Sequence, residues 1–263
     1  MKLKITILLF FALLRYDAQV INTIAGNGTP GSSGDGFLAT TAQLGNPRSV
    51  CVDASGNTYI VDFGANVIRK INSSTGIITT VAGNGSAGYS GDGNLAINAS
   101  FSFPTSICVD PLGNLYISDV GNNRIRKVNT SGIVTTIAGT GAAGYSGDGG
   151  AASSAKINGA TGLFFSSAGY ILFADKNNNR IRKILLPSGI ISTIAGNGTA
   201  GFSGDNGNQL TAQLNTPNGV CEDQTGTVYI ADLGNNRIRN IDFTQNKIFT
   251  YAGIGSVGNT GDG

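Results

Sequence analysis

Short apolar runs alternate with glycine-containing polar turns along almost the whole chain. The stretch from residue 104 to 138 contains the runs PTSICVD, LYISD, RIRKV and IVTTIA, which are separated by turn residues such as PLGN and VGNN. Runs of this length that are rich in β-branched residues and bounded by Gly, Asn and Pro are typical of β-strands. The pattern predicts four antiparallel strands joined by three tight turns, at residues 104–110, 115–119, 124–128 and 133–138.

This four-strand pattern recurs with a fixed period. Matching Ala-Gly pairs begin at Ala25, Ala82, Ala138, Ala195 and Ala252, which gives steps of 57, 56, 57 and 57 residues. Such a period indicates one supersecondary unit copied in series, and four-stranded units stacked face to face form a β-propeller. We therefore predict an all-β propeller with an outer strand and loop at residues 19–36, followed by four blades at residues 37–93, 94–149, 150–206 and 207–263.

The first 18 residues differ from the repeat. Lys2 and Lys4 precede an apolar run at residues 5–14, which has the length of a signal-peptide core and is too short to span a bilayer. We expect residues 1–18 to be a signal peptide, so that the mature chain is secreted, periplasmic or on the cell surface, without a membrane span. The alternative is a buried first strand. Cleavage would leave 14 basic and 14 acidic residues, a balance that gives no general attraction to nucleic acid.

Three cysteines occupy one repeat position. Cys51, Cys108 and Cys221 are equivalent, and the remaining blade has Phe164 there. Equivalent positions in successive blades are expected to lie farther apart than the roughly 4.4–6.8 Å between Cα atoms that a disulfide requires. An interchangeable phenylalanine indicates a buried apolar site, so we predict three free thiols in the core.

Three motifs carry a family resemblance. The second blade contains PTSICVD, GNLYISD and GNNRIRK, and the same motifs recur at residues 47–70, 217–240 and, in weaker form, 160–183. This pattern closely resembles the NHL repeat over nearly the whole mature chain. The resemblance implies a propeller, commonly of six blades, that serves chiefly in protein or RNA contacts and in some members as an enzyme. Because the chain has only four blades and begins with a fourth strand, we expect it to be a fragment, with about two further blades downstream.

The weaker repeat departs from the motif at its inner strand. Ala160 replaces the proline, and Gly169-Tyr-Ile replaces Gly-Asn-x-Tyr. Because Asp175 and Arg182 are kept, we expect a normal third blade with an altered inner strand.

Arginines recur in register on the third strand of each blade. One position holds Arg69, Arg126, Arg182 and Arg239. The position two residues earlier holds Val67 in the first blade and then Arg124, Arg180 and Arg237. The second strands end with Asp62, Asp119, Asp175 and Asp232. One interpretation is a basic ring that holds phosphate or an acidic glycan. The other, favoured by the one aspartate in each hairpin, is a set of structural Asp–Arg pairs that fix hairpin register.

The loops between blades contain Gly-Asp-Gly turns and aromatic residues. The turn aspartates are Asp35, Asp92, Asp148, Asp205 and Asp262. A single carboxylate in each loop is far from the six to eight oxygen ligands, roughly, of a calcium site. We therefore expect these aspartates to hold the turns through backbone N–H groups, and we expect no cofactor, with calcium as the alternative. The aromatic position holds Tyr89, Tyr145 and Phe202, with Ser32 in the first copy and Asn259 in the last. These rings either stack on a sugar or protein partner or pack beneath their own loops.

The chain contains no histidine. This excludes Ser-His-Asp and Cys-His catalysis and histidine-ligated zinc. The sequence therefore favours a non-catalytic scaffold that binds a protein or glycan through its loops. The alternative is a calcium-dependent lactonase or sugar-acid hydrolase, for which Glu222 and Asp223 form the one irregular acidic cluster. RNA binding fits poorly with export and zero net charge.

Overall fold

The computed structural model describes residues 20–258. The signal peptide predicted at residues 1–18, Asn259 and Asp262 lie outside the described residues. Blade 1 consists of β1 (Pro47–Val52), β2 (Thr58–Asp62), β3 (Val67–Ile71) and β4 (Ile78–Ala82). Blade 2 consists of β5 (Pro104–Val109), β6 (Leu115–Asp119), β7 (Arg124–Val128) and β8 (Val134–Ala138). Blade 3 consists of β9 (Ala160–Ser166), β10 (Tyr170–Asp175), β11 (Arg180–Leu185) and β12 (Ile191–Ala195). Blade 4 consists of β13 (Gly219–Glu222), β14 (Val228–Asp232), β15 (Arg237–Asp242) and β16 (Lys247–Ala252).

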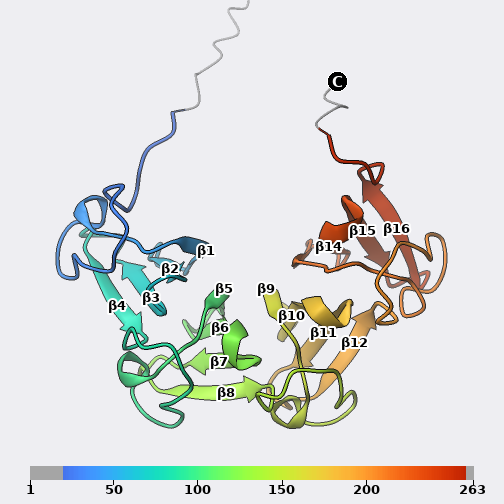
Figure 1. Ribbon diagram of the computed structural model, residues 1–263, viewed down its shortest axis with the longest axis horizontal. Coiled ribbons are helices and arrows are strands. Elements are labelled where there is room, and N and C mark those ends of the chain that lie inside the picture. Colours follow the sequence, from blue (N-terminus) through green and yellow to red (C-terminus); the bar gives the residue numbers. More distant parts are fainter. Residues whose placement is uncertain (1–19, 259–263) are drawn as a thin grey trace, which may run out of the picture.

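Each blade is a separate four-stranded antiparallel sheet whose strand order follows the sequence. The innermost strands contact one another in series, β1 with β5, β5 with β9, and β9 with β13. The four sheets are arranged as an arc, with β1, β5 and β9 toward its centre and β4, β8 and β12 on its perimeter (Figure 1). This radial arrangement confirms the predicted all-β propeller architecture.

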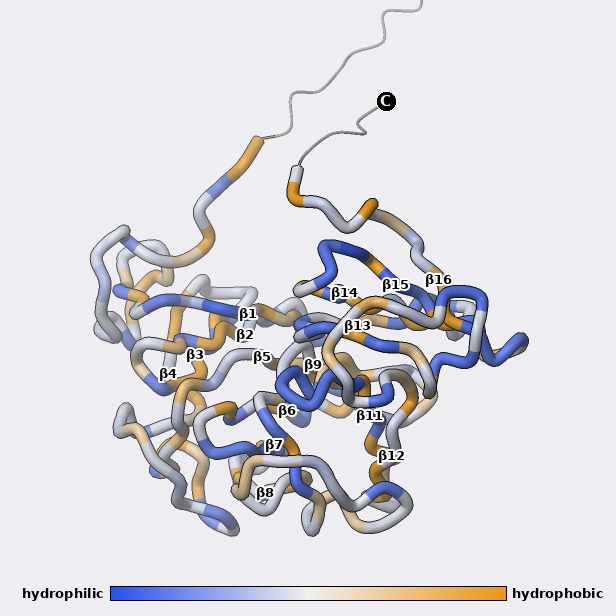
Figure 2. Tube along the Cα trace, turned by 45° about the vertical axis from the view of Figure 1, so that its right-hand side comes forward, coloured by the Kyte–Doolittle hydropathy of each residue, from blue (hydrophilic) through white to orange (hydrophobic). Residues whose placement is uncertain are grey.

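Single turns of 3-10 helix connect the strands. Three lie in the loops between sheets or before the first sheet: η1 (Ala39–Thr41), η2 (Ala96–Asn98) and η4 (Ala152–Ser154). Three join the second and third strands of a blade: η3 (Val120–Asn122), η5 (Lys176–Asn178) and η6 (Leu233–Asn235). Hydrophobic residues run through the strands, whereas many of the turns are hydrophilic (Figure 2). Within residues 20–258, no helix is long and apolar enough to cross a membrane.

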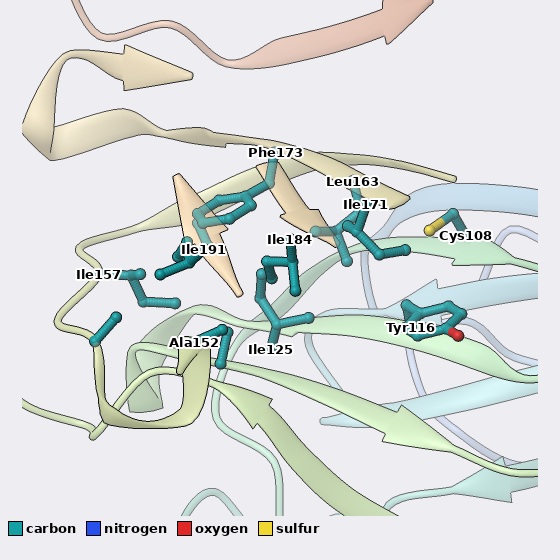
Figure 3. Close-up of a cluster of buried hydrophobic side chains, with 13 residues drawn as sticks. Cys108, Tyr116, Ile125, Ala152, Ile157, Leu163, Ile171, Phe173, Ile184 and Ile191 are labelled. Atoms are coloured by element: carbon teal, nitrogen blue, oxygen red, sulfur yellow. The ribbon is translucent and has the colours of Figure 1, made fainter. Parts of the chain in front are cut away.

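The core lies between blades. Tyr116 and Ile125 of blade 2 pack against Ile171, Phe173 and other side chains of blade 3 in one buried cluster (Figure 3). Equivalent clusters join blades 1 and 2 and blades 3 and 4. Each sheet therefore buries its apolar faces only by stacking on its neighbours, as expected for repeat architectures.

The loops between blades pack tightly against small residues. Gly91 has φ +90°, and a Cβ added to it would lie 2.6 Å from the Cβ of Ala99. Ala99 is itself completely buried. Glycine is therefore required here both for its backbone angle and for the close approach of the two chain segments.

Two predictions are wrong in detail. Residues 20–25, expected to form an outer strand, are paired with no strand of the described chain, and Ile21 is 96% exposed. This segment extends away from blade 1 (Figure 1), and without a hydrogen-bonded neighbour an extended segment is not a β-strand. All three cysteines are free, but Cys221 is exposed, whereas Cys51 is half-buried and Cys108 is buried. Cys51 and Cys108 pack in the clusters that join their blade to the next one, and no further sheet of the described chain covers the equivalent face of blade 4.

The third blade keeps the register of the others. Ala160 pairs with Asp175, as Pro104 pairs with Asp119 in blade 2. Its inner strand, β9, has 7 residues, compared with 6 in β5. Both strands begin at the equivalent residue, and the additional residue of β9 is Ser166, which pairs with Tyr170 at the other end of the strand. The break in register moves from between Pro104 and Ser106 in blade 2 to between Thr161 and Phe164 in blade 3, whereas the pairing at the start of the strand is kept.

Candidate functional site

One face of the arc carries the loops between blades. Because strands within a blade are antiparallel, the first strand begins where the second and fourth strands end. The loops at residues 83–103, 139–159 and 196–218 therefore lie on the same face as the turns after β2, β6, β10 and β14. We call this the loop face, and the predicted arginines, aspartates and aromatic residues gather beneath and along it.

In blades 2, 3 and 4, the inner arginine of the third strand (Arg126, Arg182 or Arg239) is held by two aspartates. Arg126 has no exposed surface, and its guanidinium lies 2.7 Å from Asp92 of the preceding loop and 3.4 Å from Asp119 across the hairpin. It also donates to the carbonyl of Ser90 at 2.9 Å. The same pairs, Arg182 with Asp148 and Asp175, and Arg239 with Asp205 and Asp232, occur in blades 3 and 4. A fully buried guanidinium offers no N–H group to a ligand, so these arginines do not form a ligand-binding ring.

The first blade differs from this arrangement. Arg69 pairs with Asp35 at 2.7 Å, but it forms no ion pair with Asp62. Both oxygens of Asp62 instead accept the N–H of Gly45, at 2.8 and 3.0 Å. In blade 2, Asn122 donates to the equivalent carboxylate at 2.8 Å and helps to orient it. Blade 1 has Ala65 at that position, so the predicted hairpin pair is absent there.

The arginines two residues earlier on the third strands, Arg124, Arg180 and Arg237, are called the outer arginines here. They form no ion pair with aspartate, contrary to the sequence-based expectation. Arg124 donates to the carbonyls of Asn122 at 3.0 Å and Thr140 at 2.7 Å, and its guanidinium carbon lies 3.7 Å from the ring centroid of Tyr89. Arg180 over Tyr145 and Arg237 over Phe202 repeat this distance of 3.7 Å. These three arginines therefore fasten the aromatic residues of the loops.

Each ring is fixed in place and also partly exposed. Tyr89 is 44% exposed, and Tyr145 and Phe202 are each 40% exposed. The hydroxyl of Tyr89 donates to Asp92 at 2.9 Å, and the hydroxyl of Tyr145 donates to Asp148 at 2.8 Å. Each side chain therefore packs on its arginine, as expected for a ring that holds its own loop, and is also partly exposed on the loop face, as expected for a ring that stacks on a partner.

The turn aspartates of the described chain accept hydrogen bonds from protein donors on both carboxylate oxygens. One oxygen of Asp92 accepts from Arg126, and the other accepts from the Thr136 N–H at 3.2 Å and from Tyr89. Burial acts to raise the pKa of Asp92, but the bonds from Thr136 and Tyr89 and the charge of Arg126 outweigh it, so this pKa lies below its usual 3.8. Burial dominates at Asp119, whose pKa is raised despite bonds from Asn122 and Arg126.

The threonine partners of these aspartates were not predicted from the sequence. The backbone N–H groups of Thr80, Thr136 and Thr193 donate to Asp35, Asp92 and Asp148, and the hydroxyl of Thr250 donates to Asp205. A threonine two residues before the repeated alanine was visible in every blade. The signal was present, but the contacts join residues 44 or 45 positions apart, which periodicity alone does not pair.

The irregular acidic residues lie away from the loop face. Glu222 accepts a hydrogen bond from the Tyr170 hydroxyl of blade 3. Asp223 binds the backbone of its own turn, at Thr225 and Thr227, where β13 leads into β14. Among the described residues, no group of three or more acidic, Cys or His side chains is placed to hold a metal ion.

Fold and motifs together define a propeller built of NHL-type blades. Residues 12–88 match the Teneurin NHL domain, and residues 101–128 and 214–239 match the NHL repeat. Human Teneurin-4 is 34% identical over 241 residues, which cover 82% of this chain and 8% of Teneurin-4. The chain belongs to the NHL-repeat family, and it spans only a small part of the length of the teneurins it resembles.

Solved structures share the fold at low identity. An auxiliary nutrient binding protein from Bacteroides ovatus superposes with a TM-score of 0.61 at 20% identity, covering 85% of this chain and 56% of that protein. Virginiamycin B lyase from Staphylococcus aureus gives a TM-score of 0.51 at 16% identity, covering 78% of this chain and 55% of the lyase. The fold thus serves both a binding protein and an enzyme, so function must be argued from this chain's own residues.

Proposed function

We propose that this chain is a non-catalytic binding scaffold, exported from the cell, that holds a protein or glycan partner on its loop face. The observation that carries the proposal is the series formed by Tyr89, Tyr145 and Phe202, which we call the aromatic row. Its members recur on three successive loops, are 40–44% exposed and are each clamped by a guanidinium. Export is proposed from the basic and apolar character of residues 1–18.

Clamped aromatic side chains suit a binding surface for a physical reason. A ring that is already fixed loses little rotamer freedom when a partner covers it, so less of the interaction free energy is spent on ordering. Rigid, partly exposed aromatic residues are also common among the residues that dominate binding energies. The regular spacing of the row along the arc suits an extended partner, such as a polypeptide or an oligosaccharide.

A non-catalytic role agrees with the composition of the chain. A form of the Staphylococcus aureus lyase in which one histidine is replaced by alanine is described as catalytically inactive, and this chain has no histidine. We also propose that binding requires no calcium, because the carboxylates of Asp92 and Asp148 are already bound to arginine, threonine and tyrosine donors.

The proposal is tested by replacing residues of the aromatic row with the residue that another repeat has at the same position. Serine occupies the aromatic position in the first loop, so Tyr89→Ser with Tyr145→Ser removes both rings at little risk to the fold. Purified protein would be screened on arrays of glycans and extracellular proteins, and affinities of the hits would be measured by biolayer interferometry. We expect the double variant to bind at least tenfold more weakly.

A matched control separates the ring from its hydroxyl. Tyr89→Phe with Tyr145→Phe keeps both rings, as Phe202 does naturally, and is expected to bind like the wild type. Binding is expected to be equal in calcium and in EDTA. If a folded serine variant binds every hit as tightly as the wild type, the aromatic row is not the binding surface.

A further inference from the structure

A second potential binding site lies at the centre of the arc. A pocket of about 430 Å³ opens where the inner strands β1, β5 and β9 begin, beside the turns η3 and η5. The pocket therefore lies on the part of the loop face nearest the centre of the arc, and no residue of the aromatic row lines it. Its polar side chains include Arg48, Thr105, Thr161, Lys176, Asn177 and Asn218. The volume falls within the range of small-ligand pockets, roughly 300–1,000 Å³.

The pocket is basic in a chain that is nearly neutral. Arg48 of blade 1 and Lys176 of blade 3 both line it, and none of the described lining residues is acidic. Most other basic residues of the mature chain lie on the third strands, and the inner arginines there are neutralised by aspartates. Two unneutralised cations facing one concave polar surface favour an anionic ligand.

These two cations also interrupt the repeat. At the position of Arg48, the other blades have Thr105, Thr161 and Asn218. At the position of Lys176, the other blades have Phe63, Val120 and Leu233. Blade stability does not require a cation at either position, because each of the other blades has the same fold without one.

The walls of the pocket are held in place by bonds between blades. The Ser49 hydroxyl accepts the N–H of Ile107 at 3.4 Å, and the Ser106 hydroxyl accepts the N–H of Leu163 at 2.9 Å. Arg48 is positioned by Asn46, at 3.3 Å, and by the ring of Phe63, 4.2 Å from its guanidinium carbon. The site is therefore preorganised, which lowers the cost of ordering it around a ligand.

Two hydroxyl groups of the lining residues have no protein partner. The Oγ1 atoms of Thr105 and Thr161 are buried and form no hydrogen bond within the described chain. A buried hydroxyl without a hydrogen-bond partner is energetically unfavourable. Both residues line the pocket, and a ligand rich in hydroxyl groups would supply both donors and acceptors there.

We propose that this pocket binds an anionic monosaccharide unit, such as a uronic acid, with Arg48 and Lys176 contacting its carboxylate and the threonine and asparagine side chains contacting its hydroxyl groups. The pocket is too large for a bare inorganic anion, and its polar lining does not suit an apolar acid. The proposal does not depend on the aromatic row, since the two sites share no residue.

The test measures binding of glucuronate by isothermal titration calorimetry. Glucose, which lacks the carboxylate, and acetate, which lacks the sugar hydroxyl groups, are the comparison ligands. We expect glucuronate to bind at least tenfold more tightly than either. Arg48→Thr and Lys176→Val, which introduce the residues of blade 2, are expected to weaken glucuronate binding at least tenfold each. Lys247→Gln, which removes an equal charge outside the pocket, is expected to leave the affinity unchanged.

Several outcomes would overturn the proposal. Absence of glucuronate binding, or equal affinity for glucuronate and glucose, would reject an anionic sugar site. Equal affinity for acetate would show a simple anion site without sugar recognition. Unchanged affinity in both variants would place the ligand elsewhere. Circular dichroism and melting curves would verify folding, and Lys176→Leu, which introduces the residue of blade 4, replaces the valine variant if that variant does not fold.

Discussion

At the scale of single residues, the carboxylates of the inter-blade loops connect three parts of the molecule. Asp92 lies in a loop, and it binds a guanidinium from the third strand and an N–H group from the fourth strand of the following blade. Its partner Arg126 is fully buried. Removing one member of such a pair leaves the other buried and incompletely bonded, which costs more than the pair itself contributes.

This arrangement predicts a defined pH dependence. Asp92→Asn with Asp148→Asn is expected to lower the free energy of unfolding by about 1–3 kcal/mol per site at pH 6. The pKa values of both carboxyl groups are lowered in the folded state, so their stabilisation is complete above the unfolded value of 3.8 and is lost as the pH falls through the folded values. Urea unfolding followed by circular dichroism from pH 6 to 2.5 should show the two proteins converging only below pH 3.8. Convergence already between pH 6 and 5 would contradict this account.

At the scale of structural elements, each aromatic ring and its arginine form one unit that joins a loop to a third strand. Tyr89 and Arg124 occur together, as do Tyr145 and Arg180, and the first loop lacks both, with Ser32 and Val67 at these positions. The absence of both members in the same repeat indicates that neither is useful without the other. The arginine is therefore better explained by loop anchoring than by ligand binding.

A double-mutant cycle measures this coupling. Arg124→Val and Tyr89→Ser are each expected to destabilise the protein, and the double variant is expected to lose less than the sum of the two. The interaction free energy should be about 0.5–2 kcal/mol, the range for partly exposed cation–π pairs. Thermal or urea unfolding of the four proteins provides the values. Strict additivity would show that the ring and the guanidinium do not stabilise each other.

At the scale of the whole molecule, equivalent residues differ in exposure because their neighbours differ. Ile125 of blade 2 is fully buried, whereas its equivalent Ile238 in blade 4 is 38% exposed. Likewise, Ile194 is 7% exposed and its equivalent Tyr251 is 65% exposed. The face of blade 4 that contains Cys221, Ile238 and Tyr251 thus corresponds to the faces that the other blades bury.

Thiol reactivity reports on this difference. With a disulfide reagent such as DTNB, Cys221 of the 263-residue chain is expected to react first and Cys108 only after unfolding. Burial raises the pKa of the Cys51 thiol to about 12 and also raises that of Cys108, so both are poor nucleophiles near neutral pH. Cys221→Ser should remove the fast phase alone. Reaction of Cys221 as slow as that of Cys108 in the native protein would show that the fourth blade is covered on this face.

The structure of one blade could be predicted from the sequence alone. Strand number, strand order, turn positions and the repeat length follow from local hydrophobic runs and turn residues, and four copies of one pattern reinforce each other. Asp119 and Arg126 were paired correctly because they lie on neighbouring strands of one hairpin, only two positions apart in register. The family resemblance rested on the same local motifs.

The contacts between blades and loops became known only from the folded structure. The short Arg126–Asp92 pair joins residues 34 positions apart, and the Tyr89–Arg124 stack likewise joins a loop to the next blade. Arg48 and Lys176 stand in different blades and reach one pocket because of the angle between successive sheets. That angle is set by the packing of whole blade faces, a property that neither periodicity nor residue type expresses.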